Sequence, residues 1–340
     1  MSESVPALLE VRQLRTWFPI KRGIFKKTVG HVRAVDGVSL RLEKGKTLAL
    51  VGESGCGKTT VGRSLLRLVD PQAGEVRFSG TDLLTLSSRD MHAFRRRLQM
   101  IFQDPMTSLN PRMRVEALVA EGLDSFGLCS TKSERKERVA QALDRVKLGP
   151  DVMKRFPHEF SGGQRQRIGI ARALVVGPEL LVCDEAVSAL DVSIQAQILN
   201  LLGSLQAETG MSYLFITHDL SVVRYLADEV AVMYLGQIVE QAPVSELFSH
   251  PAHPYTRGLL ASVPSPDPEA PRIVSQVLGD VPSPSSPPAG CRFHTRCPEV
   301  LDVCKREQPE LIQLGGPDKK GVRMVRCHLH QAAGSTETAP

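Results

Sequence analysis

The chain has 340 residues and a formal net charge of +5 at pH 7, from 42 Lys and Arg against 37 Asp and Glu. This length predicts about two domains, and a hydrophobic content of 42% excludes a wholly disordered chain. The longest run without charge, Val192–Ala207, contains Ser, Gln and Asn, so we expect no membrane-spanning helix. Met1–Glu10 lacks the pattern of a secretory signal, so we expect a cytosolic chain. The mild positive charge does not by itself indicate nucleic acid as a partner.

Strand and helix patterns alternate along the chain, which predicts an α/β fold with helices packed on a mixed or parallel sheet. The basic stretch Lys21–Gly30 is expected as a loop or hairpin. The predicted strands are Leu8–Leu14, Val35–Leu42, Thr47–Val51, Leu98–Phe102, Leu180–Cys183, Ser212–Thr217 and Glu229–Tyr234. The predicted helices are one starting at Lys58, then Arg89–Arg97, a mostly helical stretch from about Arg112 to Asp151, Arg165–Val176, Val192–Glu208 and Leu220–Ala227.

The composition changes near residue 263. Eight prolines fall between Pro264 and Pro288, which predicts a linker or extended tail rather than a helix or a central strand. We therefore expect a main domain at residues 1–262 and, at residues 263–340, a small, irregular, proline-rich extension that carries a cluster of four cysteines.

A glycine-rich loop, Gly52–Thr59, follows the predicted strand Thr47–Val51 and precedes a helix. Its pattern, G-x-x-x-x-G-K-T, is that of a phosphate-binding loop, in which backbone N–H groups turn toward one anion. Lys58 is expected to reach the β- and γ-phosphates of a nucleotide, and the Thr59 hydroxyl to bind Mg²⁺. The predicted nucleotide-binding residues are Gly52, Ser54, Gly55, Cys56, Gly57, Lys58, Thr59 and Thr60.

Two acidic residues, Asp184 and Glu185, follow the apolar run that starts at Leu180. A carboxylate at the end of a buried strand can hold Mg²⁺, and the next one can polarise an attacking water. We assign Asp184 to the metal and Glu185 to the general base.

The segment Phe160–Arg167 (FSGGQRQR) resembles the signature of the ATP-binding subunits of ABC transporters. Physically it is a capping Ser followed by two glycines at the start of a helix, which makes a second anion-binding helix N-terminus. The resemblance implies an ABC-type ATPase domain with a mixed sheet core and a helical subdomain at about residues 104–176. It also implies that Ser161, Gly162, Gly163 and Gln164 bind the ATP of an opposite, homologous subunit in a head-to-tail dimer.

Further positions match the same family. The resemblance implies that Gln103 contacts Mg²⁺ and the attacking water, that His218 contacts the γ-phosphate, and that Ser188–Asp191, with Asp191 binding nucleotide, crosses the dimer interface. The catalytic residues are then Glu185, His218 and Gln103, and the Mg²⁺ ligands are Thr59, Gln103 and Asp184. The family usually has Pro where this chain has Ala186. We expect hydrolysis to survive this change, since proline contributes stiffness rather than chemistry.

The residue that stacks on adenine is left open by the pattern. Counting back from Val38 and Ser39 leads to Val29 rather than to an aromatic residue. The candidates in and beside the Lys21–Gly30 insertion are Phe18, Phe25 and His31.

Three segments resemble the subfamily that takes up dipeptides, oligopeptides or nickel: the insertion before Ala34–Ser39, the segment His253–Leu260, and the tail Gly290–Pro298. The resemblance implies two transmembrane permease subunits, an extracytoplasmic peptide-binding protein, a peripheral position at the cytoplasmic face of the membrane, and no nucleic acid. The substrate remains open among dipeptides, oligopeptides, nickel and glutathione.

The tail contains Cys291, Cys297, Cys304 and Cys327. Four thiolates suit a [4Fe–4S] cluster or tetrahedral Zn²⁺, and the spacing lacks the C-x₂-C pairs common in zinc sites. The subfamily resemblance implies the iron–sulfur cluster, and the alternatives are zinc, or cysteines that are unligated or linked by disulfides.

Two other classes of function stay open. A soluble ABC-type ATPase acting on nucleic acid or ribosomes would usually carry two ATPase halves or long coiled coils, whereas this chain has one phosphate loop and no sustained heptads. A metal- or redox-sensing regulator would use the cysteine tail to control the ATPase.

Overall fold

The computed structural model describes residues 7–262, 277, 279–314 and 322–331. The chain divides into two compact units that interleave along the sequence. Unit 1 comprises Met1–Leu9, Leu42–Thr47 and Arg77–Thr217, and unit 2 comprises Glu10–Arg41, Leu48–Val76 and His218–Pro340.

Unit 1 contains three parallel strands in the order β6–β7–β8, with Leu98 opposite Leu180 and Leu180 opposite Ser212. All residues of β7 and β8 are buried, which explains why they read as short apolar runs in the sequence. The strands of this unit are β5 (Thr81–Asp82), β6 (Leu98–Ile101), β7 (Leu180–Asp184) and β8 (Ser212–Thr217). Strand β5 pairs with the last two residues of β4 (Ala73–Phe78).

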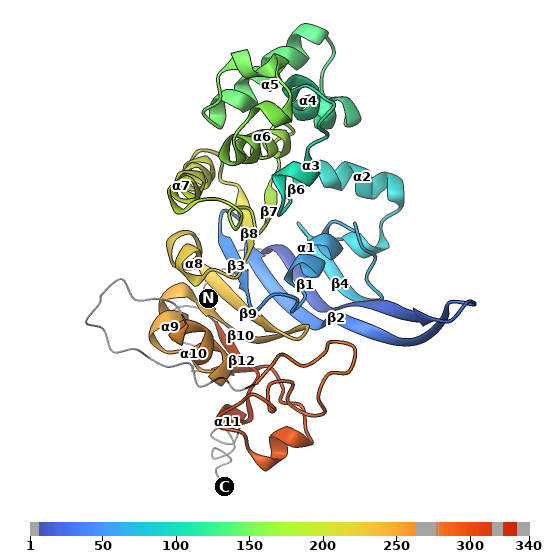
Figure 1. The fold of residues 1–340 in the computed structure, drawn as a ribbon, viewed down its shortest axis with the longest axis vertical. Coiled ribbons are helices and arrows are strands. Elements are labelled where there is room, and N and C mark those ends of the chain that lie inside the picture. Colours follow the sequence, from blue (N-terminus) through green and yellow to red (C-terminus); the bar gives the residue numbers. More distant parts are fainter. Residues whose placement is uncertain (1–6, 263–276, 278, 315–321, 332–340) are drawn as a thin grey trace. The chain divides into compact units, whose positions relative to one another are not determined.

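The helices α4, α5 and α6 of unit 1 pack against one another, as the green ribbons of Figure 1 show. Buried apolar residues recur along one face of α4 at Val115, Leu118, Val119 and Leu123, the spacing expected for an amphipathic helix. The helices of unit 1 are α2 (Ser88–Arg97), α3 (Pro105–Ser108), α4 (Val115–Ser125), α5 (Lys132–Arg145), α6 (Gly162–Leu174) and α7 (Val192–Thr209), with 3₁₀ turns at Leu83–Thr85, Pro150–Lys154 and Pro157–Glu159.

Unit 2 contains a sheet in the order β11–β12–β10–β9–β3. Strands β3 and β9 are parallel, whereas β9, β10, β12 and β11 pair in antiparallel fashion. The members of this sheet are β3 (Thr47–Val51), which enters unit 2 at Leu48, β9 (Glu229–Tyr234), β10 (Gln237–Pro243), β11 (Ile312–Leu314) and β12 (Arg323–Val325). The helices of unit 2 are α1 (Lys58–Leu65), α8 (Leu220–Leu226), α9 (Val244–Ser249), α10 (Pro254–Ala261) and α11 (His328–Gln331), with a 3₁₀ turn at Asp302–Lys305.

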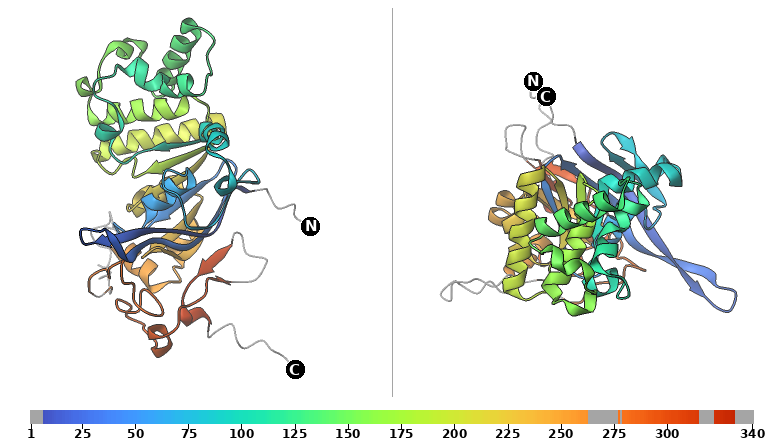
Figure 2. Two further views of the ribbon diagram at one scale, coloured as in Figure 1. Left: turned by 90° about the vertical axis from the view of Figure 1, so that its right-hand side faces the viewer. Right: turned by 90° about the horizontal axis from the view of Figure 1, so that it is seen from above.

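A long two-stranded ribbon, formed by β1 (Ala7–Arg22) and β2 (Lys27–Glu43), is the other main feature of unit 2 (Figure 2). Its turn is closed by the N–H of Lys26, which donates to the carbonyl of Gly23 at 3.0 Å. Ile24 and Phe25 at the turn are each 96% exposed. The predicted loop or hairpin at Lys21–Gly30 is therefore a hairpin.

The structure confirms the predicted strands Thr47–Val51, Ser212–Thr217 and Glu229–Tyr234. It corrects the predicted Leu8–Leu14 strand, because pairing with β2 continues it to Arg22. The expected irregular character of the whole cysteine-rich extension was wrong in part. Strand β12 of that extension pairs with β10, where Glu240 lies opposite Val325.

The predicted linker falls partly on residues 263–276 and 278, which lie outside the described part of the chain. Among the described residues, no helix combines the length and apolar character that crossing a bilayer requires.

Candidate active site

The predicted phosphate loop connects β3 to α1 within unit 2. Gly52 has a φ of 153° and Gly57 a φ of 110°, a region that L side chains rarely adopt. A Cβ at Gly52 would overlap the carbonyl oxygen of Met233, and one at Gly57 would overlap that of Ala34. Both positions therefore require glycine for steric as well as conformational reasons.

Lys58, the first residue of α1, is 4% exposed and folds back onto the loop. Its ammonium donates to the carbonyls of Gly52 at 2.7 Å and Glu53 at 3.0 Å, and it also lies 3.8 Å from the sulfur of Cys56. The loop thus holds a buried cation next to the helix N-terminus, an arrangement suited to phosphate groups. Thr59 and Thr60 follow in the first turn of α1.

Cys56 is buried within the loop, and burial raises the pKa of its thiol despite the nearby Lys58 ammonium. Its carbonyl accepts a hydrogen bond from the N–H of Gly236 at 2.9 Å. Cys56 therefore joins the loop to the β9–β10 turn through its backbone.

Unit 1 brings together Gln103 and Glu185. The Gln103 side-chain amide donates to Oε2 of Glu185 at 2.7 Å. Glu185 has a φ of 46°, unusual for a residue other than glycine, and its N–H donates to the carbonyl of Ile216 at 2.9 Å. The hydroxyl of Ser188 donates to the Glu185 carbonyl at 3.0 Å. Hydrogen bonds to its N–H and to its carbonyl thus hold the Glu185 backbone directly after β7.

Asp184, the last residue of β7, is 1% exposed. A carboxylate buried at the end of a strand is expensive unless hydrogen-bonded or bound to a cation, so its place is consistent with the predicted metal role.

The predicted signature forms the start of α6. Ser161 and Gln164 make a reciprocal capping box, in which the N–H of Gln164 donates to the Ser161 hydroxyl at 3.4 Å and the N–H of Ser161 donates to Gln164 Oε1 at 3.1 Å. A Cβ at Gly163 would overlap Cγ2 of Ile194, so α6 packs closely on the first turn of α7. Asp191 is the N-cap residue of that helix.

His218 follows β8 and is exposed, and the next residue, Asp219, caps α8 by accepting from the N–H of Ser221 at 2.8 Å. His218 and the phosphate loop belong to unit 2, whereas Gln103, Asp184 and Glu185 belong to unit 1.

The four cysteines of the tail lie near one another in unit 2. Burial, followed by the neighbouring thiols, raises the pKa of Cys291 to about 11 and that of Cys327 to about 12. The N–H of Cys291 donates to the carbonyl of Cys304 at 2.8 Å. All seven cysteines lie in described ranges, and none forms a disulfide. In the same ranges, no group of three or more His, Cys, Asp or Glu side chains is arranged to hold a metal ion.

Sequence reasoning missed three residues that hold the phosphate loop: Glu53, Tyr255 and Arg296. The N–H of Glu53 donates to the Tyr255 hydroxyl at 3.0 Å, and Arg296 forms an ion pair with the Glu53 carboxylate at 2.7 Å. Arg296 lies in the tail Gly290–Pro298 that resembles the subfamily and directly precedes Cys297, and this is the sequence signal that could have pointed to it.

Comparison with known families identifies two regions. Residues 35–188 match the family "ABC transporter", and residues 239–304 match the family "Oligopeptide/dipeptide transporter, C-terminal region".

Curated proteins are similar over almost the full chain. The "Probable peptide ABC transporter ATP-binding protein y4tS" of Sinorhizobium fredii is 49% identical over 98% of this chain and 93% of its own length. The oligopeptide transport ATP-binding protein AppF of Bacillus subtilis is 49% identical over 95% of this chain and 97% of its own. The chain belongs to the family of peptide ABC transporter ATP-binding proteins. It is therefore an ABC-type ATPase, and its main predicted function is confirmed at the level of this family.

Solved structures of ATP-binding cassettes support the fold of this peptide transporter ATP-binding protein. The dimeric cassette MJ0796 bound to ADP and phosphate is 25% identical, with a TM-score of 0.62 over 69% of this chain and 98% of that one. The protein cbiO1 of Clostridium perfringens, part of a transporter complex, is 26% identical, with a TM-score of 0.61 over 72% and 91%. These likenesses confirm the predicted ABC-type α/β fold.

Proposed function

We propose that this chain hydrolyses ATP to power the import of dipeptides or oligopeptides across the cytoplasmic membrane. The observation that carries the proposal is the phosphate loop with the buried Lys58 at the start of α1. The names of the two relatives at 49% identity support peptides as the transported class.

In this proposal Glu185 is the general base that accepts a proton from the attacking water. Gln103 positions that carboxylate through its hydrogen bond to Oε2. Lys58 leaves the carbonyls of Gly52 and Glu53 to bind phosphate oxygens, and His218 contacts the γ-phosphate.

Mg²⁺ would be held by Thr59, Gln103 and Asp184. A hydroxyl, an amide oxygen and a carboxylate are hard oxygen donors of the kind Mg²⁺ prefers, and the buried Asp184 carboxylate fits this role. When bound, the ion neutralises negative charge on the phosphates.

The proposed partners are a second, homologous ATPase subunit in a head-to-tail dimer, two transmembrane permease subunits and an extracytoplasmic peptide-binding protein. The signature Ser161–Gln164 and Asp191 then face the nucleotide of the opposite subunit. The chain itself is placed peripherally at the cytoplasmic face of the membrane. The exposed start of α6 supports a role in binding an external anion.

The aromatic residue that stacks on adenine is proposed to be Phe18. Phe18 lies on β1, and its side chain is 40% exposed. Of the other two candidates, Phe25 lies at the hairpin turn, and the ring of His31 lies 6.1 Å from the ring of Trp17.

We also propose that the chain divides into a main domain at residues 1–262 and an extension at residues 263–340.

For the four tail cysteines we propose a [4Fe–4S] cluster, with Zn²⁺ as the alternative. The donor set fits, since four neighbouring thiols are the ligands of such clusters, although their arrangement here is not that of a metal site. Protein purified without oxygen should contain about four irons and four sulfides per chain. Colourless protein with one zinc per chain would refute the cluster.

The ATPase proposal is tested with Glu185→Gln in the purified transporter complex, after the partner's own site has been inactivated. The variant should bind ATP as wild type does and lose at least 100-fold in kcat, in line with the loss of a general base. Glu208→Gln, which changes a surface carboxylate paired with Arg145, is the matched control. Residual turnover within tenfold of wild type would refute the assigned role of Glu185.

The substrate class is tested by uptake of labelled dipeptides, oligopeptides, nickel and glutathione into vesicles that contain the complex. Nickel or glutathione uptake without peptide uptake would refute the peptide assignment. Co-purification with nucleic acid in place of apolar subunits would favour the soluble ATPase class.

A further inference from the structure

Glu53, the second residue of the phosphate loop, is held at three separate points. Its N–H donates to the Tyr255 hydroxyl at 3.0 Å, and its carbonyl accepts from the Lys58 ammonium at 3.0 Å. Its carboxylate receives two hydrogen bonds from Arg296, at 2.7 and 3.1 Å. Glu53 is therefore the point where the nucleotide loop meets residues from the C-terminal part of the chain.

The contact between Arg296 and Glu53 has the geometry of a strong ion pair. Both guanidinium nitrogens at the end of Arg296 engage the two carboxylate oxygens, the bidentate arrangement that fixes direction as well as distance. The Arg296 side chain is 8% exposed and that of Glu53 is 29% exposed, so solvent screens this pair less than a surface pair. The Glu53 carboxylate raises the pKa of Arg296, which therefore stays charged.

Arg296 belongs to a short segment, Cys291–Cys297, that is anchored by two residues that precede this arginine, Arg292 and Phe293. Phe293 is 1% exposed, and its ring lies 5.3 Å from that of Tyr234 and 5.4 Å from that of Tyr255. These aromatic contacts place the segment firmly in the core of unit 2.

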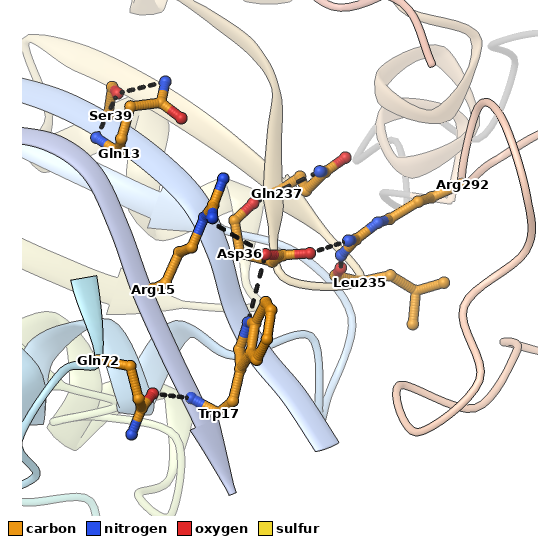
Figure 3. Close-up of polar contacts among 9 residues, drawn as sticks. All are labelled: Gln13, Arg15, Trp17, Asp36, Ser39, Gln72, Leu235, Gln237 and Arg292. Carbon is orange, nitrogen blue, oxygen red and sulfur yellow. Dashed lines mark hydrogen bonds and ion pairs between the residues drawn. The ribbon is translucent and has the colours of Figure 1, made fainter. Parts of the chain in front are cut away.

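A second arginine of the same segment, Arg292, makes an independent anchor (Figure 3). Its guanidinium forms an ion pair with the Asp36 carboxylate on β2 and donates to the carbonyl of Leu235 in the β9–β10 turn. Asp36 in turn accepts from the indole N–H of Trp17 at 3.2 Å. Arg292 thus fixes the segment to β2 and to the β9–β10 turn, independently of the contact between Arg296 and the loop.

We propose that Arg296 is a positioning residue for nucleotide binding, which holds Glu53 and with it the first turn of the phosphate loop in the conformation that receives ATP. In this proposal the C-terminal segment Cys291–Cys297 supports the nucleotide site from behind the loop, through Glu53, and supplies no group that contacts ATP. Loss of Arg296 frees the Glu53 side chain and loosens the loop, which weakens ATP binding while leaving the chemical step intact.

The test uses the full-length chain and a fluorescent ATP analogue, mant-ATP, with the thermal midpoint as a check on folding. Arg296→Met should raise the Kd for mant-ATP about tenfold, and Arg296→Lys, which keeps the charge but loses the bidentate contact, should give a smaller rise. In the purified complex, KM for ATP should rise by a similar factor, with kcat within twofold of wild type.

Arg257→Met is the matched control. Arg257 forms an ion pair with Glu299 at 2.7 Å in the same unit, but this pair is half exposed and does not touch the loop. The control should leave the Kd within twofold of wild type. An equal rise in Kd for Arg257→Met and Arg296→Met would overturn the proposal, because it would indicate a general loss of stability.

The pathway through Glu53 is tested with Glu53→Gln and the double variant Glu53→Gln/Arg296→Met. Because both single changes remove the same charged, bidentate pair, the double variant should bind mant-ATP no more weakly than the weaker single variant. Effects that multiply in the double variant would overturn the proposal. If Arg296→Met does not fold, Arg296→Lys and its double variant with Glu53→Gln decide the question in the same way.

This inference rests on the proposed placement of ATP at the phosphate loop. Wild-type chain that fails to bind mant-ATP would refute that placement, whereas wild-type binding with an unchanged Kd in Arg296→Met would refute the role of Arg296 alone.

Discussion

We expect the buried His253 to make the folded chain less stable in acid, and we expect His253→Asn to remove this part of the pH dependence. His253 is 1% exposed, and its Nδ1 accepts from the N–H of Tyr255 at 3.0 Å, so this nitrogen must be unprotonated. Burial, followed by the positive Arg257 and by His330, lowers the pKa of His253 to about 3. The Glu240 carboxylate accepts a hydrogen bond from the backbone N–H of His253 at 2.8 Å.

The magnitude follows from proton linkage. In the unfolded chain His253 takes up a proton below about pH 6.5, whereas in the folded chain it does so only near pH 3. Between these values the unfolded state binds the extra proton, so the free energy of unfolding falls by about 1.4 kcal/mol per pH unit as the solution is acidified. Lowering the pH from 7 to 5 should therefore remove about 2 kcal/mol through this residue alone. Asn keeps a cap acceptor and does not titrate.

The assay is urea unfolding of the wild-type chain and of His253→Asn at pH 7, 6 and 5. The variant should lose about 2 kcal/mol less than the wild type over this range, and the difference should follow the titration of a single group. The control is His250→Asn, since the His250 side chain is 72% exposed and should leave the pH dependence unchanged. Parallel curves for wild type and His253→Asn would refute the assignment of a neutral buried imidazole.

Three further changes test how the site is held. Gly163→Ala should destabilise unit 1 by about 1–3 kcal/mol because the added methyl group overlaps Ile194, and Ile194→Ala in the same chain should recover part of this loss in urea unfolding. Ser161→Ala removes the N-cap acceptor of α6 and should cost about 1 kcal/mol; an unchanged urea midpoint would contradict the cap. Tyr255→Phe removes the acceptor of the Glu53 N–H and should lower the thermal midpoint by about 2–4 °C, and an unchanged midpoint would indicate that water replaces the hydroxyl at no cost.

The sequence was most informative where one local segment carries the whole signal. The run Thr47–Val51 is buried at every position and is followed at once by glycines and Lys58, so the strand, the loop and the helix could all be predicted from about fifteen residues. The capping box of Ser161 and Gln164 is equally local, and its geometry follows from their spacing. The helical pattern alone placed the start of α6 at Arg165, because glycines at a helix start weaken that pattern, whereas the signature correctly placed Ser161 as the cap and the two glycines at the start.

Contacts between distant segments could not be predicted in this way. Arg296 lies 243 positions from Glu53, and no periodicity links the two. The left-handed conformation of Glu185 was equally hidden, because its residue type favours no such conformation. The strand Arg323–Val325 has three residues, too few to show alternation, and only pairing with β10 reveals it.

The segment that begins at His253 marks a subfamily in the sequence, and the structure supplies a physical reason for its residue types. The buried Glu240 on β10 accepts from the N–H groups of Ala252 and His253, each at 2.8 Å, so a carboxylate with two oxygens is needed there. His253 then caps α10 by accepting from the N–H of Tyr255, and this cap fixes the first turn from which Tyr255 extends. The hydroxyl of Tyr255 finally accepts from the N–H of Glu53. Each residue in this series satisfies a backbone group that would otherwise be buried without a partner, and together they connect β10 to the phosphate loop. The segment that marks the subfamily thus also supports the phosphate loop, since removing any one of these acceptors leaves the next backbone N–H without its hydrogen bond.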